Sequence, residues 1–140
     1  MIRSMVLVSG LALVLSASAL AASPAHPHFE VKLEPQNGSK IGGTATIVHE
    51  SPPPAVVVTI VLDGVFIPEN QYPAGVYAGT CAKLAAEPAY RLEPVMGGRS
   101  TTRLTVKRPM SGPYAIAVFR TDGKRTMSCG ELPMMKHSHR

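Results

Sequence analysis

The stretch "AVVVTIVL", residues 55–62, decides the fold. Thr59 is its only polar residue, and most of its side chains are β-branched. Such a composition is typical of a central strand in a β-sheet. The prolines at residues 52–54 stop the pattern on one side, and Asp63-Gly64 supplies a turn on the other. The run therefore predicts a strand at the centre of the protein, either in its core or at a dimer seam.

Further short stretches on both sides have the alternation and the bordering turn residues of strands. Strands are predicted at residues 29–33, 43–49, 91–95, 101–107, 114–120 and 126–132. Asn37-Gly38 and Asp122-Gly123 are turn signals between them. No segment favours a long helix. We therefore expect an all-β domain, an antiparallel sandwich or barrel of about seven or eight strands.

Residues 65–90 are expected to be irregular, because prolines and glycines interrupt them repeatedly. Residues 83–87 could form a single helical turn. A long loop in a small β domain is usually functional or held by a cross-link. Cys81 lies in this segment and could supply the cross-link.

The N-terminus has the pattern of an export signal. Arg3 gives a positive start, residues 5–15 are mostly apolar, and Ala19 and Ala21 are the small residues that a signal peptidase requires. We expect residues 1–21 to be a signal peptide. Residue 23 is serine, so the cysteine that a lipoprotein anchor requires is missing. The mature protein is expected in the periplasm or the medium.

The mature chain is expected to be one domain with two short tails. Residues 22–28 form a flexible N-terminus, 29–132 the β-sandwich domain and 133–140 a flexible C-terminal tail. No segment after the signal is apolar for long enough to span a bilayer.

The mature chain contains two cysteines, Cys81 and Cys129. An even pair in an exported protein most often forms one disulfide. A reactive or metal-binding thiol pair is the alternative, although the spacing is not that of a CxxC motif.

Acidic and basic residues are unevenly distributed along the chain. Residues 30–69 carry five acids and two bases, net −3, whereas residues 83–140 carry eleven bases and four acids, net +7. The basic half, residues 91–125 above all, could face an anionic polymer or lipid. The absence of tryptophan, the few aromatics and the lack of an arginine-rich run argue against a nucleic-acid partner.

Five short motifs occur in a characteristic order. They are "GTATI" at 43–47, "YPAGVYAGTC" at 72–81, "YRLEPVMGGRSTT" at 90–102, "YAIAVF" at 114–119 and "SCGEL" at 128–132. Together they resemble small secreted proteins with a copper/zinc superoxide-dismutase-like Greek-key fold, a group related in architecture to CHRD-type domains. The resemblance implies a Greek-key sandwich over residues 29–132 and a disulfide from the loop at Cys81 to the last strand at Cys129.

The chain departs from the resembled family at the metal ligands. In that family the first cysteine usually follows Pro-Ala-His-x-His-Glu-Gly-Thr, and the later strand ends in histidine. Here the two histidine positions of the loop are Gly75 and Tyr77, the glutamate position is Ala78, and the later histidine position is Phe119. Copper redox cycling needs clustered imidazoles. The segment is therefore expected to be a degenerate metal loop, and the protein to have no superoxide dismutase activity.

Other catalytic arrangements are weakly supported. A Ser/His/Asp triad would need His49 with Asp63 or Asp122, and both aspartates lie in turns. We expect His49 to be hydrogen-bonded or solvent-facing. A glycosidase pair would have to come from four glutamates that are typical of solvated strand faces, namely Glu30, Glu34, Glu50 and Glu69.

The remaining histidines lie in the tails with two methionines. The potential ligands are His26, His28, Met134, Met135, His137 and His139. Imidazole and thioether groups suit copper. The favoured interpretation is an exported, non-enzymatic binding or structural module without a cofactor, whose partner is a protein or another envelope component. The alternative is a periplasmic copper- or zinc-binding protein that uses these tails.

Overall fold

The computed structural model describes residues 28–51, 53–106 and 112–133. Nine strands form in chain order. They are β1 (His28–Pro35), β2 (Gly42–Glu50), β3 (Ala55–Asp63), β4 (Tyr72–Thr80), β5 (Lys83–Leu84), β6 (Tyr90–Val95), β7 (Arg99–Leu104), β8 (Tyr114–Phe119) and β9 (Thr126–Glu131). The residues of the predicted signal peptide, His26 and the residues beyond Pro133 lie outside the described residues, as does Lys107. His28, expected in the flexible N-terminus, instead begins β1.

The central-strand prediction for residues 55–62 is confirmed. β3 pairs with β2 along its whole length and with β7 on its other side, both in the antiparallel sense. Val58, Ile60 and Leu62 alternate into the core, whereas Val61 faces outward and is exposed. Only one face of this apolar strand therefore packs into the core.

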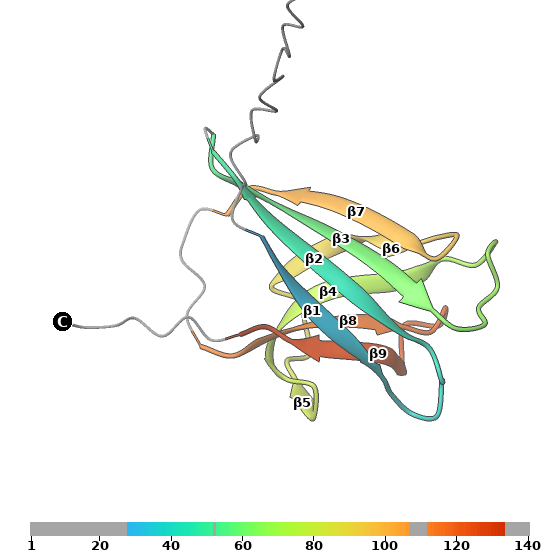
Figure 1. Ribbon diagram of the computed structural model, residues 1–140. Coiled ribbons are helices and arrows are strands. Elements are labelled where there is room, and N and C mark those ends of the chain that lie inside the picture. Colours follow the sequence, from blue (N-terminus) through green and yellow to red (C-terminus); the bar gives the residue numbers. More distant parts are fainter. Residues whose placement is uncertain (1–27, 52, 107–111, 134–140) are drawn as a thin grey trace, which may run out of the picture.

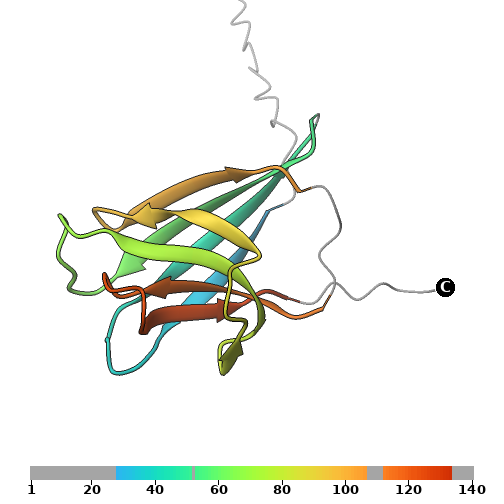
Figure 2. The same cartoon turned by 180° about the vertical axis from the view of Figure 1, so that it is seen from behind.

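The strands form one curled antiparallel sheet with two facing halves (Figures 1 and 2). One half has the order β7-β3-β2-β1, and the other has β9-β8-β4 with β6 on the far side of β4. A short ladder between the end of β1 and β9 joins them, Glu34 opposite Cys129 and Pro35 opposite Ser128. β3 lies beside β7 and β4 beside β8, so the chain crosses between the halves in the Greek-key manner. The all-β, antiparallel fold class is therefore confirmed.

The space between the two halves holds the main hydrophobic core. Its fully buried side chains include Leu33, Ile60, Val95, Ile116 and Val118, contributed by four different strands. The β6–β7 hairpin closes the open side with side-chain hydrogen bonds. Ser100 Oγ donates to the Glu93 carbonyl at 2.6 Å, and the Glu93 N–H donates to Thr102 Oγ1 at 2.7 Å.

The expected irregular segment at residues 65–90 is the main correction. Residues 72–80 form β4, a nine-residue strand between β8 and β6, and the expected helical turn is replaced by β5, which pairs with the end of β4. Pro73 is tolerated because it lies at the register shift between Tyr72 and Ala74, where the ladder to β6 is interrupted. The other strand boundaries lie within three residues of those predicted.

Both predicted hairpin turns are present. Asn37 and Gly38 have positive φ angles of 52° and 71°, as a tight turn between β1 and β2 requires. Between β8 and β9, the Gly123 N–H donates to the Arg120 carbonyl at 2.8 Å, and the Arg120 N–H donates to the Arg125 carbonyl at 2.9 Å. Local turn chemistry therefore fixes the register of these two pairs.

Candidate functional site

A second apolar cluster lies on the outer face of β4, β8 and β9, opposite the main core. Its buried members are Ala115, Ala117 and Cys129, and the half-buried side chains of Tyr77, Cys81, Leu84 and Phe119 pack against them. We call these seven residues the outer cluster. The segment between β4 and β6 contributes Cys81 and Leu84, so part of the outer sheet face is covered by the chain itself.

The three positions that the resemblance singled out lie together at this cluster. Gly75 and Tyr77 are two residues apart on β4, so they share a face of the sheet. Phe119 ends β8, the neighbouring strand. The Tyr77 and Phe119 rings lie with their centroids 5.4 Å apart and their planes tilted by 60°. Aromatic packing therefore fills the space between β4 and β8 at this point of the outer face.

Gly75 is needed for this packing. A Cβ atom at residue 75 would lie 2.9 Å from Tyr77 Cε2 and 3.2 Å from Pro88 Cβ. Contacts that short require the neighbouring groups to move. The absence of a side chain at Gly75 therefore leaves the space that the ring of Tyr77 occupies.

The predicted disulfide is confirmed. Cys81 and Cys129 are bonded, with their Cα atoms 5.8 Å apart, and they tie the segment after β4 to β9. The Glu131 carboxylate accepts the Cys81 N–H at 3.2 Å beside it. A disulfide of this kind is compatible with an extracellular location.

Tyr77 is the one described residue whose pKa is clearly shifted. Burial raises the pKa of its phenol above the ordinary value. The Arg91 charge lowers that pKa and the Glu87 charge raises it, and these two side chains form an exposed ion pair at 3.9 Å. The phenol is therefore held neutral through the physiological range.

The catalytic triad that the sequence allowed does not assemble. His49 pairs with Val56 near one end of β3, whereas Asp63 pairs with Gly42 at the other end. Seven residues along β3 (63 − 56) correspond to about 23 Å. Asp122 lies in the β8–β9 turn, where its carboxylate accepts the Lys124 N–H at 2.9 Å.

The side chain of His49 is half-buried, and one of its two ring nitrogens is enclosed. Its Nε2 atom is buried without a hydrogen-bond partner, and its ring centroid lies 6.0 Å from that of Phe29. The ring of His49 therefore packs against that of Phe29 across the β1–β2 pair.

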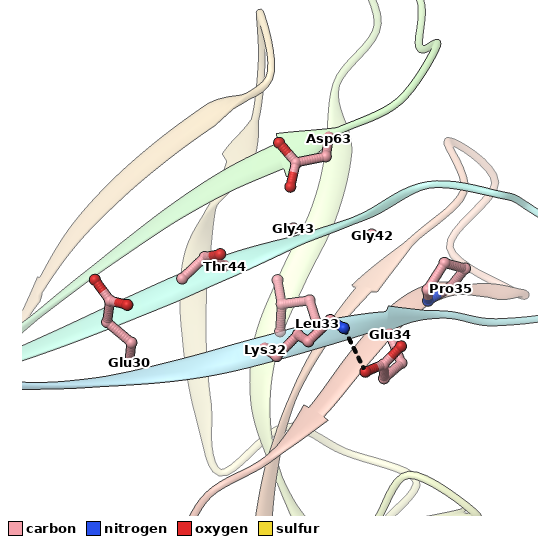
Figure 3. A pocket seen from close by; sticks show the side chains of 9 residues that line it. All are labelled: Glu30, Lys32, Leu33, Glu34, Pro35, Gly42, Gly43, Thr44 and Asp63. Carbon is pink, nitrogen blue, oxygen red and sulfur yellow. Dashed lines mark ion pairs between the residues drawn. The ribbon is translucent and has the colours of Figure 1, made fainter.

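The glutamates considered for glycoside chemistry do not form a pair. Figure 3 shows Glu30 and Glu34 around an open depression on the outer face of β1 and β2, with Asp63 at its edge. Lys32 Nζ lies 3.4 Å from the Glu34 carboxylate. Glu50 forms an ion pair with Arg103, and Glu69 is exposed in the β3–β4 connection. Within the described ranges, no three His, Cys, Asp or Glu side chains are grouped as metal ligands would be.

The residues of the alternative metal hypothesis are mostly outside the described ranges. His26, Met134, Met135, His137 and His139 cannot be placed, whereas His28 lies opposite Val48 at the start of β1. Since β1 starts and β9 ends at the same end of the sheet, both tails attach there.

Exposed apolar side chains in the loops at the other end of the sheet were not predicted from the sequence. Val65 and Ile67 in the β3–β4 connection are 95% and 57% exposed, and Met96 in the β6–β7 turn is 55% exposed. In the sequence, these apolar residues lie beside the turn residues Gly64, Pro68 and Gly97, which indicates that they belong to loops. Their proximity at one end of the sheet follows only from the topology.

The chain matches no protein-family model, no curated protein and no solved structure. Nowhere in residues 28–51, 53–106 and 112–133 is there a helix long and apolar enough to cross a membrane.

Proposed function

We propose that the protein is an exported, non-enzymatic binding or structural module of superoxide-dismutase-like type, in which the former metal face has become a packed apolar surface. One observation carries the proposal. The three positions matched to ligand histidines, Gly75, Tyr77 and Phe119, come together on the outer face of β4 and β8, and an aromatic pair fills the space between them.

The disulfide supports this proposal. It joins the segment after β4 to β9 beside the aromatic pair, as the resemblance implied. A loop fastened in this way keeps its structural role without metal ligands. Export to the periplasm or the medium agrees with the leader-like residues 1–21 and with the oxidised cysteines.

The test is a calorimetric titration of residues 22–140, oxidised, with Cu(I), Cu(II) and Zn(II), together with an assay of superoxide removal. We expect no superoxide removal in any metal-loaded sample. Metal-dependent superoxide removal by the purified chain would overturn the proposal. The same assay on Tyr77→Ala would then show whether that activity involves the outer cluster.

A second candidate is copper or zinc binding by the tails. It is favoured by the attachment of both tails at one end of the sheet, where His28 begins β1. Under this hypothesis the titration shows tight, stoichiometric binding, and deletion of residues 22–28 and 133–140 abolishes it. Binding that survives both deletions would exclude the tails as the site.

A further inference from the structure

Four connections leave the sheet at the end opposite the two tails. They are residues 36–41, 64–71, 96–98 and 120–125, which lie at the right of Figure 1. The antiparallel registers place them together, since the end of β3 pairs with the start of β2 and lies beside the start of β7. We call this group of connections the loop end.

All exposed large apolar side chains of the described residues belong to the loop end or its border. Val65, Ile67 and Met96 are each more than half exposed, and Val61, near the end of β3, is 40% exposed. Single exposed apolar residues are ordinary, but their concentration at one place indicates an interaction surface. The other end of the sheet has none among its described residues.

The β3–β4 connection holds these side chains outward. Phe66, between Val65 and Ile67, turns inward and packs on Gly98, whose position has no room for a Cβ. The Ile67 N–H donates to the Tyr72 hydroxyl at 3.1 Å, and the Gly97 N–H donates to the Pro68 carbonyl at 3.1 Å. The exposed residues are therefore fixed before any partner arrives, which lowers the entropic cost of binding.

The charge around these residues is positive. Five bases lie in or beside the four connections, Lys40, Arg99, Arg120, Lys124 and Arg125. Three acids, Asp63, Glu69 and Asp122, accompany them, which leaves a net charge of +2 (5 − 3). All eight side chains are exposed. Exposed apolar side chains in a region of net positive charge are complementary to a surface with anionic headgroups over an apolar interior.

We propose that the loop end docks on an anionic phospholipid bilayer, with Val65 and Ile67 inserted at the headgroup boundary and the surrounding bases against lipid phosphates. A second copy of the chain fits less well, because a symmetric contact through this end would set the same five bases against each other. The inference does not depend on the superoxide-dismutase-like resemblance or on the outer cluster.

The experiment is vesicle flotation with residues 22–140, which contain every residue of the two hydrophobic clusters and omit the apolar leader. Vesicles are phosphatidylcholine alone or a mixture with phosphatidylglycerol. We expect binding only to the anionic vesicles, weakened by salt. Val65→Ser/Ile67→Ser should reduce the partition coefficient by at least about tenfold, since the inserted apolar area is lost.

Charge substitutions test the second half of the proposal. Lys124→Ala/Arg125→Ala should weaken partitioning by roughly 30-fold at low salt, the effect of two basic side chains at an anionic surface. Lys83→Ala/Arg91→Ala removes the same charge away from the loop end and should have a much smaller effect. Thermal unfolding of each variant verifies that it is folded.

Three results would overturn the proposal. They are no binding to anionic vesicles, equal binding by the serine variant, and equal loss in both alanine pairs, which would indicate nonspecific charge attraction. Sedimentation without lipid tests whether the loop end instead binds a second copy of the chain. Concentration-dependent association that is abolished by Val65→Ser/Ile67→Ser would assign the loop end to that contact. Competition by millimolar inorganic phosphate would assign it to a soluble anion.

Discussion

The ring of Tyr77 packs against the ring of Phe119 across the β4–β8 pair, and the space beside it is left free by Gly75. Three residues from two neighbouring strands thus form a single packed unit on the outer sheet face.

Gly75→Ala should destabilise the protein by about 1–3 kcal/mol, because the added methyl group overpacks the contact with Tyr77 and Pro88. The same substitution in a Tyr77→Ala background should cost less, because only the longer contacts, such as that with Pro88 Cβ at 3.2 Å, remain. Urea unfolding of the four proteins of this double-mutant cycle measures the coupling. Equal losses in both backgrounds would show that the ring at Tyr77 is not the obstacle.

Histidine substitution at all three positions tests whether the outer face has the geometry of a metal site. In residues 28–133, which exclude most of the tail ligands, Gly75→His/Tyr77→His/Phe119→His should bind Zn²⁺ or Cu²⁺ more tightly than the unsubstituted chain does. Calorimetry gives the affinities. The variant with only Tyr77→His is the control, and equal affinity in the single and triple variants would argue against a former three-ligand face.

Loss of the Cys81–Cys129 disulfide should lower the free energy of unfolding by roughly 4 kcal/mol, because the bond closes a loop of 48 residues in the unfolded chain. Unfolding of the oxidised and reduced protein in urea measures the difference. The Cys81→Ala/Cys129→Ala protein should match the reduced protein. A difference below about 1 kcal/mol would imply strain in the folded state.

Ser128 lies in the interior with its hydroxyl unpartnered. Ser128→Ala should therefore raise the free energy of unfolding, by about 1 kcal/mol, as an unsatisfied buried polar atom is removed. Ser100→Ala is the matched control, since Ser100 Oγ donates to the Glu93 carbonyl and its loss should cost about 1 kcal/mol. A loss of stability in Ser128→Ala would mean that the hydroxyl has a partner in solution.

Alkaline pH should destabilise the protein partly through Tyr77. Burial raises the pKa of Tyr77 in the folded state above the 10.0 of an ordinary tyrosine, so the folded protein retains the proton more tightly than the unfolded chain. This contribution to stability is present below the unfolded pKa and is lost as pH rises through the folded pKa. Tyr77→Phe should show a shallower decline of stability above pH 10. Parallel curves for the two proteins would refute the assignment.

The strands could be predicted wherever alternation and turn residues agreed, as at β3 and around Asp122-Gly123. β4 could not, because Pro73, Gly75 and Gly79 read locally as breakers and only the neighbouring strands make them tolerable. The disulfide followed from a count of two cysteines.

The clusters on the surface could not be predicted from the sequence, because they depend on the order in which the strands pair. Three strands, β5, β6 and β7, lie between Tyr77 and Phe119 in the chain, and only the β4–β8 pairing brings the two rings into contact. Val65 and Met96 likewise meet at one end because of the order of the strands. Sequence alone gives each residue's chemistry but not its neighbours.

The short ladder between β1 and β9 has a consequence for the time course of folding. Glu34 pairs with Cys129, 95 positions later (129 − 34), and this pairing joins the two halves of the sheet. The hairpins of β1, β2 and β3 can form early, but the other edge of β1 stays unpaired until β9, the last strand, is available. Contacts between residues so distant in the chain slow folding. During synthesis, that unpaired edge is the segment most exposed to wrong pairing with another chain.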